Sequence, residues 1–194
     1  MDGGVVSAGI LYLHGFRSSP ASWKARLLAD ALAARGLADR LACPFLSHAP
    51  DEAIAQCEAI IARRDGPLTV IGSSLGGFYA TWLAEKHDLA AALINPAVAA
   101  PVSLEKYLGA QTNLHTHESF EFTVEHVARL RALEVARITP SRYLLMVETG
   151  DEVLDYRQAV ARYAGCRQIV LPGGDHSFTR FPDHVAQLIE YCGL

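Results

Sequence analysis

Cysteine is scarce in this chain of 194 residues, and what there is lies far apart. None of the four cysteines forms a Cys-x-x-Cys pair: they are Cys43, Cys57, Cys166 and Cys192. We therefore expect reduced and mostly buried thiols, with a disulfide pair as the alternative.

Long apolar runs are missing as well. No stretch approaches the roughly 20 apolar residues that span a bilayer. The apolar run 89–100 is interrupted by Asn95-Pro96 and is better interpreted as a buried strand. The start, Met1-Asp2-Gly3-Gly4, lacks the basic region of a secretory signal, and no Asn-x-Ser/Thr sequon occurs. The expectation is a cytoplasmic protein without a membrane partner.

An excess of positive charge is also absent. The 17 Lys and Arg residues against 21 Asp and Glu give a net charge of 17 − 21 = −4, and the longest basic run is Arg63-Arg64. A large basic surface is excluded, so no nucleic-acid partner is expected. The sequence has no HExxH, GxxxxGK[ST] or strand-linked GxGxxG, which leaves zinc-protease, P-loop and dinucleotide-binding classes without support. We expect no metal and no cofactor.

What the sequence does contain is a repeated alternation of short apolar runs and helical patterns. Its 51% hydrophobic content excludes intrinsic disorder and suits one domain over residues 1–194. The strands are predicted at 10–13, 40–45, 68–72, 90–95, 142–148 and 167–171. The helices are predicted at 21–35, capped by Ser19 with Pro20 at its first position, and at 51–64, 75–86, 155–163 and 182–191. Such alternation predicts a parallel sheet with helices on both faces.

Residues 96–141 break this rhythm. They carry helical patches at 103–108 and 123–134 but no strong strand signal. A segment this long is more than a connector and predicts a short helical insertion after the fourth strand. It would be a lid or a wall of the substrate pocket, or else a crossover that only packs on the sheet.

Ser74 is the strongest candidate for chemistry. It is the centre of Gly72-Ser73-Ser74-Leu75-Gly76, which matches G-x-S-x-G between a predicted buried strand and a predicted helix. A sharp strand-to-helix turn holds the serine hydroxyl above the sheet, and side chains at the two glycine positions would collide with neighbouring backbone. Ser73 does not fit this register. The alternative is a glycine-rich structural turn.

A serine nucleophile needs a base, and His176 is the best placed. It lies in the glycine-rich loop 173–178 directly after the last predicted strand, where ligands meet an open α/β sheet. His87, His126 and His184 fall in or beside helices and are more typical of packing or surface residues. His115-x-His117-Glu118 could hold a metal, but in a loop it is more typical of solvated surface.

The third group is expected after the strand that precedes the histidine loop. Asp151 follows the strand 142–148 at the turn Thr149-Gly150 and is the first choice. Glu148, Glu152 and Asp155 compete with it, although Asp155 is better suited to cap the next helix. Asp151 could also be only a turn residue.

Two backbone N–H groups are expected to bind the oxyanion of the tetrahedral intermediate. One belongs to Leu75, the residue after the nucleophile, and the other to Phe16 in the loop after the first strand. His14 in the same loop is expected to brace it through hydrogen bonds and not to transfer protons.

These motifs together resemble the YqiA-type esterases (YqiA/YcfP-like small bacterial α/β-hydrolases). The resemblance lies in His14-Gly15-Phe16, in the Ser74 motif with the residues after it, in Asn95-Pro96-Ala97-Val98, in the block 149–157 and in the loop 173–178. It implies an α/β-hydrolase fold and hydrolysis of carboxylic esters, with acyl-CoA thioesters as a possible second substrate class. It also implies a Ser74–His176–Asp151 triad acting on a small-molecule acyl substrate.

The expected mechanism is attack of Ser74 on an acyl carbonyl, with an acyl-enzyme that water then hydrolyses. The rivals are the same triad acting on a lactone or amide, and a non-catalytic binding protein on a hydrolase scaffold. Because the first strand begins about ten residues into the chain, we expect a trimmed hydrolase fold with an open site.

Overall fold

A computed structural model describes residues 8–194 of the protein. The stretch Met1-Asp2-Gly3-Gly4, expected not to be a secretory signal, lies outside the described residues. Within them, no helix has both the length and the apolar character needed to cross a membrane.

The centre of the molecule is a six-stranded sheet in which every neighbouring pair is parallel. Its order is β2-β1-β3-β4-β7-β8. The strands are β1 (Gly9–Leu13), β2 (Leu41–Ala42), β3 (Leu68–Ser73), β4 (Ala90–Ile94), β7 (Tyr143–Glu148) and β8 (Arg167–Leu171). After β1 the chain passes to β2 on one side of it and then crosses to β3 on the other side. The strand order therefore reverses at β1, which creates a switch point between β1 and β3 at the carboxyl edge of the sheet.

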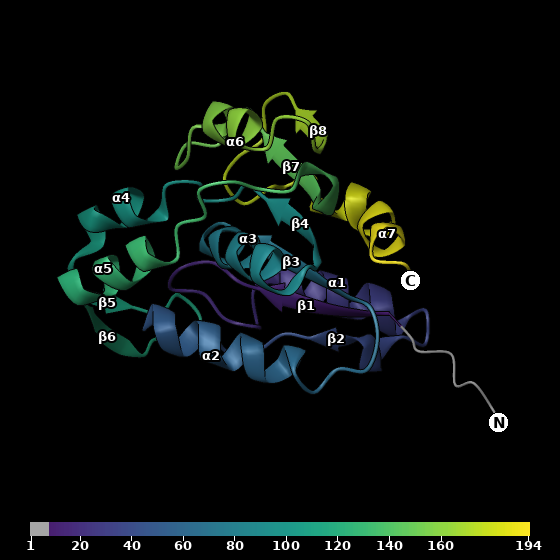
Figure 1. The fold of residues 1–194 in the computed structure, drawn as a ribbon, viewed down its shortest axis with the longest axis horizontal. Helices are drawn as coiled ribbons and strands as arrows, with labels where there is room; N and C mark the ends of the chain where they lie inside the picture. Colours follow the sequence, from purple (N-terminus) through teal and green to yellow (C-terminus); the bar gives the residue numbers. More distant parts are fainter. Residues whose placement is uncertain (1–7) are drawn as a thin grey trace.

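Helices cover both faces of this sheet (Figure 1). One face carries α1 (Trp23–Ala33) and α7 (Phe181–Tyr191), and the other carries α2 (Pro50–Ile61), α3 (Leu75–His87) and α6 (Tyr156–Arg162). The central strands are buried on both faces: all six residues of β3 and all six of β7 are buried. Their continuous apolar runs in the sequence follow from this two-sided burial.

The six predicted strands are therefore confirmed, and the predicted α/β class with them. The second strand is shorter than the predicted 40–45, because a 3₁₀ turn, η1 (Ala38–Arg40), precedes it and only two residues pair at this edge of the sheet. The predicted start of α1 was wrong. Its N-cap is Ser22, and the Ser19 hydroxyl instead accepts from Ala21 N at 3.0 Å in the preceding turn.

The insertion after β4 contains more than helices. Its helical elements are α4 (Ala100–Leu104), η2 (Glu105–Tyr107), α5 (Val124–Ala132) and η3 (Pro140–Arg142). Between them lies an antiparallel hairpin, β5 (Gly109–Thr112) and β6 (Ser119–Phe122), that the sequence analysis did not predict. The signal was the alternation Ser-Phe-Glu-Phe in β6, which turns Phe120 and Phe122 to the side of Phe16.

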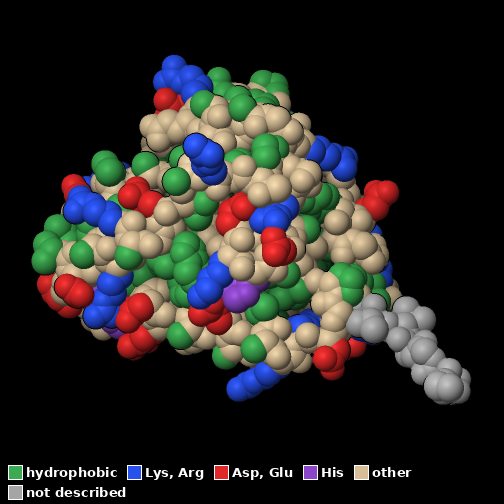
Figure 2. Space-filling view, in the orientation of Figure 1, with side chains coloured by type: hydrophobic (Ala, Val, Ile, Leu, Met, Phe, Trp, Pro, Cys, Tyr) green, Lys and Arg blue, Asp and Glu red, His purple; other side chains and the backbone are tan. Residues whose placement is uncertain are grey.

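All four cysteines are free thiols; Cys57 and Cys192 are buried as expected, whereas Cys43 and Cys166 are only partly buried. Burial raises the pKa of Cys57 and of Cys192 to about 12, which keeps both as inert thiols near neutral pH. On the outside, Lys and Arg side chains are interspersed with Asp and Glu on the face seen in Figure 2, where they form no continuous basic area.

Candidate active site

Ser74 lies where β3 turns sharply into α3. Its backbone has φ 55° and ψ −119°, a conformation that costs a non-glycine residue about 1–3 kcal/mol and is held only by its surroundings. Ser74 N donates to Ile94 O at 3.1 Å, and Ser74 O accepts from Gly77 N and Ala97 N. The turn is thus fixed from both sides, and it lifts the serine side chain to the carboxyl edge of the sheet.

Glycine is required on both sides of this turn. A Cβ on Gly72 would lie 2.2 Å from Gly76 O, and one on Gly76 would lie 2.0 Å from Leu13 O. Both distances are far below contact, and the opposing atoms are backbone that cannot move aside. The collision expected from the motif is therefore present.

The side chains of Ser74, His176 and Asp151 lie in one hydrogen-bonded row. Ser74 Oγ is 3.0 Å from His176 Nε2, and His176 Nδ1 is 2.8 Å from Asp151 Oδ2. Because a carboxylate only accepts, His176 donates from Nδ1, which leaves Nε2 free to accept the serine proton. The structure thus brings together residues that are far apart along the chain: Ser74 and His176 are separated by 102 positions, and Asp151 and His176 by 25.

Asp151 is held by its own turn. Its Oδ1 accepts from Val153 N at 2.9 Å and from Leu154 N at 2.8 Å, so that only Oδ2 faces the imidazole. The Asp151 side chain is 2% exposed and that of His176 is 22% exposed. The acidic end of the row is therefore shielded, while the imidazole and the half-buried Ser74 remain accessible.

Asn95, at the end of β4, joins the histidine loop to the sheet. Its Nδ2 donates to Asp175 O at 3.0 Å and to His176 O at 3.1 Å, and its Oδ1 accepts from Glu148 N at 3.0 Å. The residue is 2% exposed and has φ 41°, which asparagine tolerates better than most residues. One amide group therefore connects the ends of β4 and β7 with the backbone of the candidate base.

Glu148, a competitor for the acid position, has a different environment. Its fully buried carboxylate accepts from Asp175 N at 2.9 Å and from Arg180 Nε at 3.0 Å, and within the described residues it forms no hydrogen bond with the His176 ring. Burial acts to raise the pKa of Glu148, but these hydrogen bonds outweigh it and the net pKa lies below the usual value. Glu148 is thus an ionised anchor beneath the loop.

Two further side chains hold the same loop. Lys24 Nζ donates to Ser177 O at 2.7 Å, and Glu152 Oε2 accepts from His176 N at 3.0 Å. Burial lowers the pKa of Lys24 to about 8, although Asp175 and other nearby carboxylates favour its charged form. Loop 173–178 is therefore attached to α1, β4, β7 and the turn that carries Asp151.

His14 braces the loop after β1, as expected. Its Nε2 accepts from Leu46 N at 3.1 Å, so the neutral ring carries its proton on Nδ1 and donates to Gly15 O at 3.0 Å. Burial lowers the pKa of His14, which favours this neutral form.

Two backbone N–H groups near Ser74 have no acceptor. Phe16 N makes no hydrogen bond with residues 8–194, and Leu75 N is the first of α3, where no intrahelical acceptor exists. A Cβ added to Gly15 would lie 3.3 Å from Ser74 Cβ, which shows how closely this loop approaches the serine.

The other histidines lie in structural settings. His87 Nε2 is 2.8 Å from Glu58 Oε1, His126 closes the capping box of α5 with Thr123, and His184 lies in α7 near Gln187. His115 and His117 are exposed, and residues 8–194 contain no grouping of three or more side chains able to hold a metal. Asp155 caps α6 by accepting from Arg157 N at 3.0 Å.

No role was assigned from the sequence to Asn95 or Lys24, and Glu152 was a candidate only as an alternative to Asp151 in the acid position. A signal existed for Asn95, because a polar residue directly after a buried apolar strand and before proline lies at the carboxyl edge of the sheet. No local pattern identifies Lys24 or Glu152, whose contacts depend on how the loops fold over one another.

Solved structures with the same fold are similar over most of their length. Alpha/beta hydrolase domain-containing protein 10 from mouse has a TM-score of 0.70 at 17% identity, over 94% of this chain and 89% of that one. A monoacylglycerol lipase from Paleococcus ferrophilus has 0.69 at 15% identity, over 95% and 93%. Est1E from Butyrivibrio proteoclasticus, solved with ferulic acid, has 0.65 at 15% identity, over 97% and 90%.

These similarities establish the α/β-hydrolase fold that the motifs implied. A family model, described as "Uncharacterised protein family (UPF0227)", matches residues 9–193. Because this match spans almost all of the described chain, the protein belongs to the family UPF0227, that of the YqiA/YcfP-like proteins its motifs resemble.

Proposed function

We propose that the protein is a serine hydrolase that cleaves carboxylic esters, with Ser74 as nucleophile, His176 as general base and acid, and Asp151 as the group that orients the imidazole. The observation that carries the proposal is the row Ser74 Oγ–His176 Nε2–His176 Nδ1–Asp151 Oδ2, with spacings of 3.0 and 2.8 Å. The strained backbone of Ser74 supports it, because such strain gathers at functional sites.

In this mechanism Ser74 Oγ attacks the acyl carbonyl while His176 Nε2 takes its proton. The alcohol leaves with a proton from His176, and an acyl group remains on Ser74. Water then attacks that ester with His176 again as base, which releases the acid and restores the serine. Asp151 holds the Nδ1 tautomer that both steps need.

The oxyanion would be bound by the N–H groups of Phe16 and Leu75. Neither has an acceptor among the residues that the structure describes, and both belong to backbone packed close to Ser74. Because these donors are already oriented, no reorganisation is needed in the transition state. In other serine hydrolases, the loss of one oxyanion-binding donor lowers kcat by a factor of about 10²–10³.

Esters are the first choice of substrate, and names among the similar structures, a monoacylglycerol lipase and the esterase Est1E, favour the same class. Acyl-CoA thioesters, lactones and amides are bonds that the same three groups could cleave. A substrate panel with matched acyl groups separates these activities.

Replacing Ser74 by alanine tests the proposal. We expect Ser74→Ala to keep its fold and lose hydrolysis of a short-chain p-nitrophenyl ester by at least about a thousandfold, because it removes the hydroxyl that is hydrogen-bonded to His176 Nε2. A fluorophosphonate probe should label the unmodified protein and fail to label the variant.

Ser73→Ala is the matched control, since it removes a neighbouring hydroxyl outside the row, and it should be labelled normally. Unchanged ester hydrolysis in Ser74→Ala would refute the assignment. Absence of labelling in the unmodified protein would favour a binding protein on a hydrolase scaffold.

A further inference from the structure

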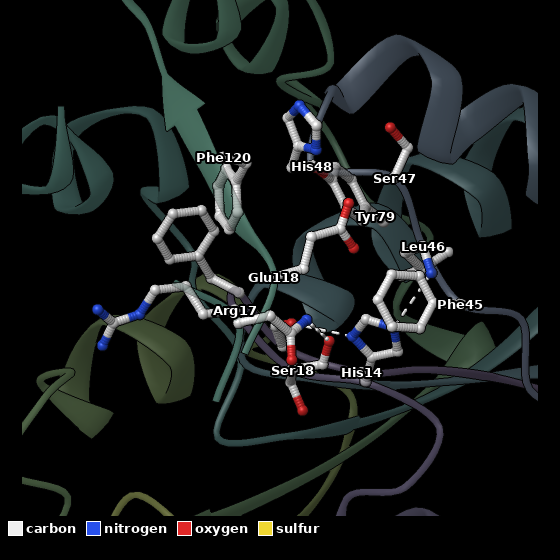
Figure 3. A pocket seen from close by; sticks show the side chains of 13 residues that line it. His14, Arg17, Ser18, Phe45, Leu46, Ser47, His48, Tyr79, Glu118 and Phe120 are labelled. Atoms are coloured by element: carbon white, nitrogen blue, oxygen red, sulfur yellow. Dashed lines mark hydrogen bonds between the residues drawn. The ribbon is translucent and has the colours of Figure 1, made fainter. Parts of the chain in front are cut away.

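A hollow of about 480 Å³, including its open mouth, lies beside the candidate active site. Three segments surround it: the loop 14–18 after β1, the loop 45–48 after β2, and the turn and second strand of the β5–β6 hairpin (Figure 3). Tyr79 of α3 also lines it. No step of the proposed mechanism uses these side chains.

The hollow begins next to the nucleophile. It is lined by Gly15 and Phe16, and the Gly15 Cβ position is 3.7 Å from Ser74 Oγ. A carbonyl oxygen that accepts from Phe16 N would therefore lie at this end of the hollow. One of the two substrate groups bonded to that carbonyl can then extend into the hollow.

Strand order decides whether the acyl group or the alcohol of an ester extends into the hollow. The leaving alcohol must lie near His176 Nε2, which protonates it, and His176 follows β8 at one edge of the sheet. The hollow lies on the opposite side, toward the loop after β2 at the other edge. The alcohol and the acyl group thus leave the carbonyl in opposite directions, and the acyl group faces the hollow.

Aromatic rings form much of its wall. The ring centroid of Phe120 lies 5.9 Å from that of Phe16 in an edge-to-face pair, and 4.8 Å from that of His48 in a stacked pair. Phe45 packs edge-on against His14 at 6.0 Å. Rings arranged at such angles offer both faces and edges to a further flat ring.

Two polar side chains that line the hollow, Tyr79 and Glu118, have no hydrogen-bond partner among residues 8–194. Tyr79 is 2% exposed, yet its hydroxyl forms no hydrogen bond with any group of residues 8–194. The Glu118 carboxylate points in from the hairpin in Figure 3, is exposed at the mouth, and forms no ion pair within the described chain. Arg17 does not neutralise it, because the guanidinium is directed away toward Gln111 Oε1, at 3.1 Å.

We propose that this hollow binds the acyl group of the substrate and selects an aromatic ring that ends in a hydrogen-bond donor, a hydroxyl or an ammonium group. The Glu118 carboxylate would accept from that donor, and the Tyr79 hydroxyl would donate to a substrate hydroxyl or accept from an ammonium group. The rings of Phe16, Phe45 and Phe120 would enclose the substrate ring. The inference rests on the proposed ester hydrolysis and names its substrate class. The unpaired hydroxyl of the buried Tyr79 side chain explains the selection, since a site built to hydrogen-bond rejects an analogue that lacks the group.

The test compares methyl esters of 3-phenylpropanoic acid that differ only at the para position: hydrogen, methoxy, hydroxyl and aminomethyl. We expect kcat/KM for the hydroxyl or the aminomethyl ester to exceed that of the methoxy ester by about tenfold or more. A higher value for hydroxyl assigns the site to phenols, and a higher value for aminomethyl assigns it to cations.

Two variants locate the effect. Tyr79→Phe removes only the unpaired hydroxyl, and Glu118→Gln removes only the charge; each should reduce the preference at least threefold. Glu121→Gln is the matched control, because Glu121 alternates with Phe120 and Phe122 on β6 and faces the other side. It should leave the preference unchanged.

Labelling by a small ethyl fluorophosphonate tests the proposed serine hydrolase separately from the acyl-binding role of the hollow, because so small a probe can react with Ser74 without binding in the hollow. Equal kcat/KM for all four esters, with normal labelling, would overturn the acyl-site inference alone. A preference that persists unchanged in both Tyr79→Phe and Glu118→Gln would also overturn it. Failure of labelling in the unmodified protein would refute the proposed function instead.

Discussion

At the scale of single residues, Asn95 shows how much of a candidate site can depend on a group outside the reacting row. Its one amide satisfies a backbone donor of β7 and two backbone acceptors of the histidine loop. All three partners are buried or half-buried, so each lost bond leaves a polar group unpaired at a cost of about 1–3 kcal/mol.

We therefore expect Asn95→Gly to reduce kcat about 10- to 100-fold with little change in KM, because glycine accepts φ 41° but makes none of the three bonds. Asn95→Asp keeps the acceptor for Glu148 N and adds a negative charge near His176. That charge favours the protonated imidazole and should move the acid limb of the kcat/KM profile to higher pH.

The acid limb should stay in place in Asn95→Gly, which adds no charge, so the pH profile distinguishes positioning from simple destabilisation. Asp88→Gly is a suitable control, since Asp88 also has a positive φ of 55° but caps α3 at its far end. Native kcat in both Asn95 variants would show that the loop does not need the amide.

At the scale of elements, the β5–β6 hairpin supports the loop that carries Phe16. Buried Asn113 donates to Ser18 O at 2.8 Å, and Leu114 N donates to Arg17 O at 2.8 Å. Asn113 Oδ1 also accepts from His115 N and Thr116 N, which shapes the turn of the hairpin. The insertion is thus part of the scaffold around Ser74 and not a remote decoration.

Asn113→Ala should lower the free energy of unfolding by about 1 kcal/mol or more, because the buried Asn113 side chain makes three hydrogen bonds to half-buried or exposed backbone groups. It should also slow fluorophosphonate labelling, since the backbone of Phe16 loses its support. Thermal unfolding and labelling rates measure the two effects. Thr116→Ala in the same turn serves as control, and labelling at the native rate in Asn113→Ala would show that the loop keeps its shape unaided.

At the scale of the whole molecule, a second polar network lies at the amino ends of the strands, away from Ser74. The Glu85 carboxylate accepts from Thr139 N at 2.7 Å, from Tyr143 Oη at 2.7 Å and from Arg142 Nη1 at 2.9 Å. Burial opposes ionisation of Glu85, but these donors prevail and its pKa is lowered. This network joins α3 to η3 and β7, and so fastens the end of the insertion.

A carboxyl group with a lowered folded-state pKa stabilises the protein above its unfolded-state value of about 4.3. This contribution is lost as the pH falls through the folded-state pKa. We expect Tm to fall between about pH 5 and pH 3, and to fall less steeply in Glu85→Gln, which no longer titrates there. Parallel Tm curves for the two proteins would contradict this, and ester hydrolysis at pH 7 should be unaffected in the folded variant.

Much of the architecture was determined by the sequence alone. Six apolar runs alternating with helical patterns specified the parallel sheet, because strands buried on both faces must be continuously apolar. The glycines around Ser74 likewise specified a sharp turn. The rule that loops gather at the carboxyl edge then indicated which polar residues would meet.

Only the tertiary structure decided which side chains support the row Ser74–His176–Asp151. Asn95, Glu148 and Lys24 hold the histidine loop from three elements far apart in the sequence. The hollow between loop 14–18, loop 45–48 and the hairpin likewise exists only once β2 lies beside β1 and the insertion folds back. Local patterns encode backbone conformation, whereas contacts across distant loops depend on strand order and on the packing of every element between them.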